Sequence, residues 1–250
     1  GFSMSALTLG TGGLVRTLHS TATAGGGAHV RGALVAPADT VLHFADCSAV
    51  DSGGAVVAGS VVTAGLVLVE RAGAGIGGGF FAGDLELAGN VRFYNVSATI
   101  TGAAVAATGS VVNVSYIVVR GAAVPVGAAV STIGAGTVTM VDAVIAEVTG
   151  LLFSLDATAV TLTGVDLSPE RSGTVTGSAG ASISTSCACA QPGCVAFVAP
   201  TGRVACEQCA APRTGNNTVA SVVDGVAQEA CTCPPGYVDV GSGECEACAA

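Results

Sequence analysis

A glycine-marked repeat constrains the fold of this 250-residue chain more than any other feature. One glycine precedes a short apolar run in each unit, and successive glycines lie 23 to 27 residues apart. These anchors are Gly27, Gly54, Gly78, Gly102, Gly127, Gly150 and Gly173. The units are rich in β-branched residues and show no sustained helical periodicity, which is typical of short strands. Such a unit cannot bury its apolar face alone, whereas stacked copies can.

Stacking predicts an all-β fold, a right-handed parallel β-helix solenoid with about 23–25 residues per turn over residues 1–180. Each strand would pair with its copy one turn along, about 4.8 Å away. Half of the residues are hydrophobic but only 4% are aromatic, so the core must be built mainly from small and β-branched side chains. The anchor glycines, Gly78 among them, are expected at corners with positive φ.

A polar residue follows a large apolar one about eight residues before most of the anchors. The resulting column comprises Asp46, Glu70, Asn95, Arg120 and Asp142. It is interpreted first as a corner position where Asp and Asn side chains bond their own backbone, and otherwise as a surface that contacts a cation or a glycan. A third reading makes Asp46 and Glu70 a carboxylate pair of a retaining glycosidase. No catalytic residue, metal ligand or cofactor is assigned.

Charge and hydropathy exclude several classes of function. The net charge is −9 and all eight basic residues are Arg, so no basic patch is expected for nucleic acid. The glycines of residues 73–79 fit the repeat, and no Lys follows them as a phosphate loop would require. The uncharged stretches 93–119 and 121–141 are interrupted by Gly, Thr, Ser and Asn, so neither is expected to span a membrane. Any membrane contact is expected through a segment outside this chain.

The GGAVV stretch at 53–57 resembles the GGA-aliphatic element of polymorphic outer-membrane protein repeats. That family pairs the element with F-x-x-N, where this chain has F-x-D at 44–46 and F-x-N at 93–95. The resemblance covers roughly residues 20–180. It implies a parallel β-helix and a role in adhesion.

The sequence changes character after a small-residue linker at 181–186. Nine cysteines fall in residues 187–250, in two runs of C-x-C followed by C-x-x-C. No His lies near them and the spacing between the C-x-x-C pairs is too wide for a zinc site, so disulfides are expected. The remaining cysteine, Cys47, is expected to be a small buried apolar residue.

The stretch CTCPPGYVDVGSGECEAC resembles EGF-like and growth-factor-receptor cysteine-rich repeats of eukaryotic ectodomains. That resemblance implies the pairs Cys187–Cys194, Cys189–Cys206, Cys209–Cys231 and Cys233–Cys245. Cys248 would then pair with a cysteine beyond residue 250, and the array would continue.

Three sequons, at Asn95, Asn113 and Asn216, predict glycosylation and a secreted or cell-surface location. The expected function is non-catalytic adhesion or recognition of cell-surface glycans or proteins. One alternative is the ectodomain of a transmembrane receptor, with a kinase elsewhere in the protein. The other is a β-helix polysaccharide lyase or glycoside hydrolase.

Overall fold

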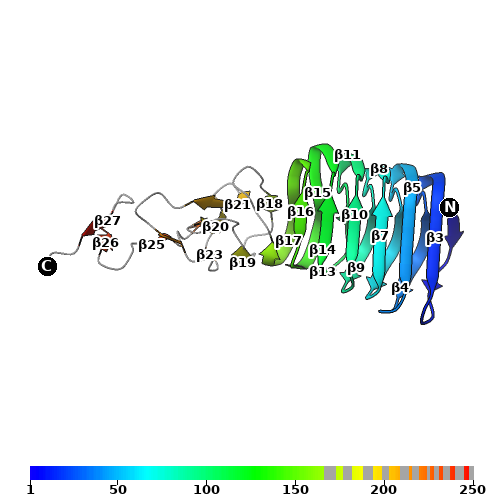
Figure 1. Ribbon diagram of the computed structural model, residues 1–250, viewed down its shortest axis with the longest axis horizontal. Coiled ribbons are helices and arrows are strands. Elements are labelled where there is room, and N and C mark those ends of the chain that lie inside the picture. The colour runs from blue at the N-terminus through cyan, green and yellow to red at the C-terminus, as the bar shows by residue number, and fades with distance from the viewer. Residues whose placement is uncertain are drawn as a thin grey trace.

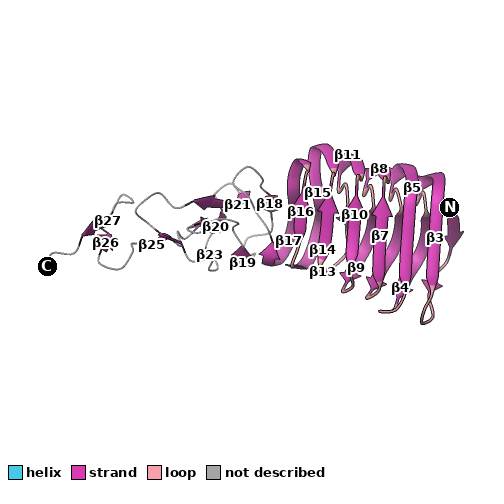
Figure 2. Cartoon of the chain, viewed as in Figure 1, coloured by secondary structure: helices cyan, strands magenta, loops and turns pink. Residues whose placement is uncertain are grey.

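The structure is a computed structural model that describes residues 1–165 continuously, with side chains as far as Thr161. Beyond them it describes the backbone of the strands between residues 173 and 247 and the side chain of Tyr237. Every regular element in these described parts is a β-strand (Figure 2). None of the described residues forms a helix that has the length and apolar character needed to span a bilayer.

Nineteen strands follow one another along the main ladder. They are β1 (Phe2–Met4), β2 (Leu7–Thr8), β3 (Leu14–Ala24), β4 (Ala28–Ala36), β5 (Val41–Ser52), β6 (Val56–Thr63), β7 (Leu66–Glu70), β8 (Gly73–Ile76), β9 (Phe80–Leu87), β10 (Val91–Tyr94), β11 (Ser97–Thr101), β12 (Val105–Ala107), β13 (Val111–Ser115), β14 (Ile117–Arg120), β15 (Ala123–Val141), β16 (Val144–Ala146), β17 (Thr149–Val165), β18 (Gly173–Thr176) and β19 (Ser182–Cys187). The later strands are β20 (Cys194–Val198), β21 (Arg203–Gln208), β22 (Thr214–Gly215), β23 (Ala220–Val223), β24 (Val226–Ala227), β25 (Cys231–Thr232), β26 (Tyr237–Asp239) and β27 (Cys245–Ala247).

The first seventeen strands form a parallel β-solenoid of about six turns, which confirms the predicted fold class (Figure 1). Each strand pairs in parallel with its counterpart one turn along the chain. One such row joins Ala28, Val56, Phe80, Val105, Val130 and Phe153. The turns measured along this row contain 28, 24, 25, 25 and 23 residues, close to the predicted period.

We call one of the parallel sheets of the solenoid the front sheet. It consists of β7, β10, β14 and β16 together with the first halves of β3 and β5, and it faces the viewer in Figure 1. Its side chains alternate between the core and solvent, as a pleated strand requires.

The core is narrow and continuous, and aromatic rings fill its centre. The Phe80 ring meets Phe44 edge to face at a centroid distance of 6.5 Å, and it meets Phe93 in the same way at 5.4 Å. All three side chains are fully buried. Val, Leu and Ala rows fill the rest, as the composition predicts.

Three consecutive glycines form the corner before β9, and each is a glycine for a different physical reason. Gly77 has a φ of 64°, and Gly25, Gly53 and Gly102 occupy the same corner with φ between 62° and 69°. The next residue, Gly78, does not have positive φ; it is a glycine because a Cβ there would overlap the backbone oxygen of Ser97. The predicted positive φ at Gly78 is therefore wrong by one residue, and the residue with positive φ is Gly77.

The third residue of the corner leaves space for the rings. A Cβ at Gly79 would lie 2.5 Å from Cε1 of Phe93, and one at Gly27 would lie 2.5 Å from Cδ1 of Phe44. The predicted anchors thus mix three neighbouring columns. Gly102, Gly127 and Gly150 lie three residues before Val105, Val130 and Phe153, in line with Gly77. Gly102 and Gly150 have the predicted positive φ, whereas Gly127 does not.

The ladder continues past β17. β18 pairs in parallel with Ser154–Asp156, and β19 pairs in parallel with Ala159–Val165, so backbone predicted as linker extends the ladder. The later strands pair antiparallel, as in β20 with β21 and β26 with β27. The side chains of the nine cysteines after residue 186, and with them the predicted disulfides, lie outside the described residues. Cys47 is a free, buried cysteine, as expected.

Candidate functional site

A single residue with left-handed backbone joins each front-sheet strand to the strand that follows it. We call this column the left-handed corner. It comprises His19, Asp46, Arg71, Asn95, Gly121 and Glu147, with φ between 50° and 68°. For residues other than glycine this conformation costs on the order of 1 kcal/mol each. The ladder holds it in place, because the amide groups of Arg71 and Asn95 donate to the next turn, to Tyr94 O and Arg120 O, at 2.9 Å.

The predicted polar column is split among three positions. Asp46 and Asn95 lie in the left-handed corner. Glu70 and Arg120 come one residue earlier, where Glu70 pairs with Ala45 and Tyr94, and Arg120 with Tyr94 and Ala146. The single stacked column is therefore corrected to two adjacent rows.

Asp142 belongs to neither row. It lies just before β16, at the end of the front sheet where the strands begin, and it also has a positive φ, of 50°. A polar residue thus follows a large apolar one at this other corner as well, since Asp142 comes two residues after the buried Met140.

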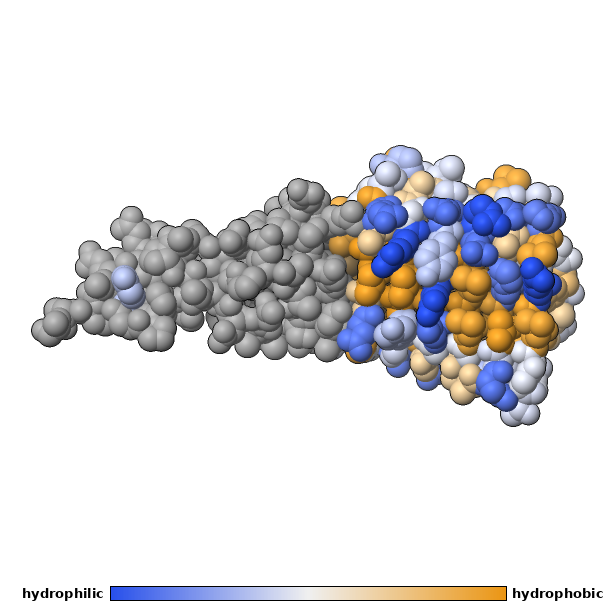
Figure 3. All heavy atoms as spheres, in the orientation of Figure 1, coloured by the Kyte–Doolittle hydropathy of each residue, from blue (hydrophilic) through white to orange (hydrophobic). Residues whose placement is uncertain are grey.

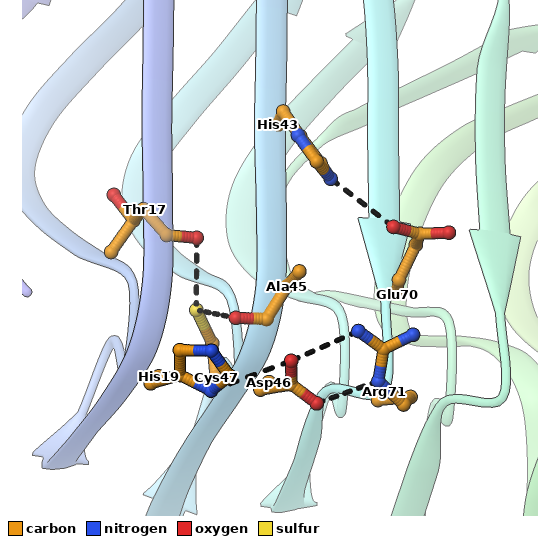
Figure 4. Close-up of polar contacts among 8 residues, drawn as sticks. All are labelled: Thr17, His19, His43, Ala45, Asp46, Cys47, Glu70 and Arg71. Carbon is orange, nitrogen blue, oxygen red and sulfur yellow. Dashed lines mark hydrogen bonds and ion pairs between the residues drawn. The ribbon is translucent and has the colours of Figure 1, made fainter.

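An ion network occupies the left-handed corner over its first three turns (Figure 4). Arg71 makes a two-pronged contact with Asp46, with Nε 2.6 Å from Oδ1 and Nη2 2.9 Å from Oδ2. His19 Nδ1 lies 3.5 Å from Oδ2 of the same carboxylate. The hydrogen bonds from Arg71 hold the pKa of Asp46 below its ordinary value, and the carboxylate in turn raises the pKa of Arg71. Asp46 is thus a carboxylate fixed between two basic side chains.

Glu70 has its own basic partner. His43 Nε2 lies 3.2 Å from Glu70 Oε2, and the two side chains point toward each other across neighbouring strands in Figure 4. Asp46 and Glu70 therefore each face a basic group on the adjacent turn. The interpretation of the two as a carboxylate pair of a retaining glycosidase stays a prediction.

The outward side chains of the front sheet form two rows beside the left-handed corner. The first row is Arg16, His43, Leu68, Arg92, Val118 and Val144; the second is Leu18, Ala45, Glu70, Tyr94, Arg120 and Ala146. Figure 3 shows this face, with hydrophilic side chains gathered along its upper part and apolar ones below. Of the five arginines whose side chains the structure describes, only Arg31 lies elsewhere, on β4.

Two other carboxylates have the structural role predicted for corner residues. Asp84 Oδ1 accepts from the Val111 amide at 3.0 Å, and Asp156 Oδ2 accepts from the Gly134 amide at 3.0 Å. They bond backbone of a neighbouring turn rather than their own. Over the described side chains, no group of three potential metal ligands comes together.

The sequons occupy different environments. Asn95 is exposed at the left-handed corner, whereas Asn113 is half-buried in β13 between Glu86 and Thr139 on the adjacent turns. Asn216 lies outside the described residues. Glycosylation of these positions stays a prediction.

Sequence reasoning missed Arg71, His19, Arg16 and Arg92 as members of this surface. Arg71 and His19 hold the same backbone position as Asp46 but share no chemistry with it, so a search for matching polar residues passes over them. For Arg71 the signal was its position two residues after the buried Val69, as Asp46 follows Phe44 and Asn95 follows Phe93. His19 follows the half-buried Thr17 and lacks this signal.

No family model matches the sequence, and the comparisons with curated proteins and with solved structures give no match either.

Proposed function

We propose that this chain is a non-catalytic recognition module of an extracellular or cell-surface protein and acts in adhesion. The observation that carries the proposal is the front sheet. It presents two outward rows and the left-handed corner side by side, on a ladder whose rungs repeat about every 5 Å. A rigid solenoid with such rows offers an extended binding surface, which is how many repeat proteins use their stacked faces.

The two sequence resemblances support the same proposal. The GGA element at 53–57 forms a corner and the start of β6, and in polymorphic outer-membrane protein repeats this element belongs to adhesive β-helices. The cysteine-rich residues 187–250 resemble EGF-like and receptor repeats, which fits an oxidising, extracellular compartment. The sequons at Asn95 and Asn113 agree with that location.

A binding screen tests the proposal directly. The 250-residue protein, produced through a secretory pathway, is applied to a glycan array and to intact cells, and bound polysaccharides are checked for shortened products. We expect saturable binding and no turnover. Turnover of any polysaccharide, or no binding on either platform, would overturn the proposal.

A further inference from the structure

Charge is distributed unevenly around the solenoid. From β3 to β14 the front sheet and the left-handed corner carry four arginines, Arg16, Arg71, Arg92 and Arg120, against two carboxylates, Asp46 and Glu70. The other faces of the same turns carry Arg31 against Asp39, Asp51, Asp84 and Glu86. In a chain with net charge −9, the front sheet is therefore a locally basic surface.

Both carboxylates on this surface have a basic side chain beside them: Arg71 pairs with Asp46, and His43, which is charged only when protonated, lies beside Glu70. The remaining guanidinium charges are not matched. Arg16 and Arg120 are exposed and have no hydrogen-bond or ion-pair partner among the described residues. Arg92 donates through Nε to the neutral Oδ1 of Asn90 at 2.9 Å, which orients the guanidinium but leaves its charge uncompensated.

Two of these arginines, Arg92 and Arg120, are neighbours of Tyr94 on the front sheet. Arg92 and Tyr94 point outward from β10, and Tyr94 pairs with Arg120 on β14 while Arg92 pairs with Val118. The four side chains form a two-by-two patch on adjacent turns. Strand geometry places the Cα atoms of Arg92 and Arg120 diagonally, roughly 8 Å apart.

The side chains of this patch determine which kind of ligand it can bind. A guanidinium binds a carboxylate through two parallel hydrogen bonds. A Tyr ring gives a flat apolar surface with a hydroxyl at its tip, and Val118 adds apolar surface beside it. Nucleic acid requires a dense basic footprint, whereas this surface has sparse arginines separated by apolar and ion-paired side chains. A polymer of uronic acids carries one carboxylate on each sugar ring, so it offers both the charged groups for the arginines and the ring faces for the Tyr.

We propose that Arg92, Tyr94 and Arg120 form a binding site for acidic, uronate-bearing polysaccharides on the front sheet. This assignment rests on the proposed recognition function and names its ligand class. The ladder fixes the backbone of both strands on either side, since β10 pairs with β7 and β14, and β14 pairs with β16. The site is therefore preorganised, which lowers the ordering cost of binding.

Binding to polygalacturonate, with dextran as the neutral polymer, tests the site in the whole 250-residue protein. Arg120→Gln is expected to weaken binding about tenfold, as the loss of one charge-assisted hydrogen-bond pair implies. Arg92→Gln/Arg120→Gln should bring binding down to the level on dextran. Arg31→Gln removes the same charge from β4 and should leave affinity unchanged. Far-ultraviolet circular dichroism and the melting temperature verify that each variant is folded.

Arg120→Lys separates geometry from charge. It keeps the positive charge but loses the planar fork, so binding should fall several-fold and become more sensitive to salt. Equal losses for Arg31→Gln and Arg120→Gln would show that net charge alone matters and would overturn the site. Arginine-dependent binding that prefers duplex DNA over polygalacturonate would overturn the ligand class.

The outcomes distinguish this site from the broader function. Binding to neutral glycans or proteins but not to polygalacturonate overturns the site and leaves the recognition function standing. Binding to polygalacturonate that depends on Arg92 and Arg120 but is followed by its cleavage upholds the site and overturns the non-catalytic function.

Discussion

Thr63 carries the one buried side-chain oxygen that has no hydrogen-bond partner among the described residues. It faces the core from β6, between Ala36 and Leu87 on the adjacent turns. A buried hydroxyl without a partner costs about 1–3 kcal/mol of desolvation. Thr40 is equally buried, but its Oγ1 donates to Pro37 O at 2.6 Å.

Thr63→Val should therefore stabilise the protein, because it removes the unpaired hydroxyl and keeps the β-branched shape. We expect the free energy of unfolding to rise by about 1 kcal/mol in urea denaturation. Thr40→Val is the matched control and should lower the free energy of unfolding by a similar amount. A loss of stability at Thr63 would show that its hydroxyl has a partner, such as a buried water.

Asp46, which is half-buried at the left-handed corner, makes a pH-dependent contribution to stability. Its pKa is held below the ordinary value of 3.8, chiefly by the hydrogen bonds from Arg71. A carboxyl whose pKa is lowered by folding stabilises the folded state above its unfolded pKa, and this stabilisation disappears as the pH falls through the lower folded pKa.

Asp46→Asn should thus lower the melting temperature at pH 7, and the difference from the wild type should shrink below pH 3.8. Melting curves between pH 7 and pH 2 measure it. In 1 M NaCl the difference should also be smaller, since exposed ion pairs are screened. A difference that grows toward low pH would contradict the assigned role of Arg71.

At the scale of elements, the three-residue corner connects backbone geometry to core packing. Gly77 turns the chain, Gly78 lets two backbones approach, and Gly79 makes room for the Phe93 ring. The rings of Phe44 and Phe93 each lie against a glycine, Gly27 and Gly79. Large and small side chains that alternate in this way give an interior its close packing.

Gly79→Ala should destabilise the protein by about 1–3 kcal/mol, because the added methyl overlaps Cε1 and Cδ1 of Phe93 and the backbone oxygen of Ala104. Gly10→Ala is the control, since a Cβ there meets nothing within 4 Å. Phe93→Leu should recover part of the loss in the Gly79→Ala background. Additive effects in this double-mutant cycle would show that the two residues are not coupled.

These corners also show how far the sequence predicts the fold. The period and the strand class followed from Val-rich runs between glycines, because period and composition are properties of each unit. The sequence did not predict which glycine of each unit has the positive φ. Gly27, Gly54 and Gly102 occupy three neighbouring positions of the corner and are glycines for three different reasons. For the candidate site, Asp46 and Asn95 were found because their chemistry recurs. Arg71 was not found, because its backbone conformation recurs and its chemistry does not.

At the scale of the whole molecule, the ladder makes stability depend on how many neighbours a turn has. β7 pairs with both β5 and β10, whereas β3 pairs with β5 alone among the described strands. In stacked repeats, terminal units have one interface fewer and open more readily.

Hydrogen exchange followed by mass spectrometry should therefore show unequal protection. Amides of Leu66–Glu70 are expected to exchange about tenfold or more slowly than those of Leu14–Leu18. Peptides from β10 should behave like those from β7. Equal protection of β3 and β7 would contradict the dependence of stability on the number of paired neighbours.

The left-handed corner has a consequence for how such a molecule can change over evolutionary time. His, Asp, Arg, Asn and Glu all occupy one backbone geometry there, so the corner accepts unrelated side chains without altering the path of the chain. Point substitutions at these positions can rewrite the chemistry of the surface while the architecture stays constant. Each turn thus holds one side chain at a fixed position, and the binding specificity of the surface can change by one substitution in one turn.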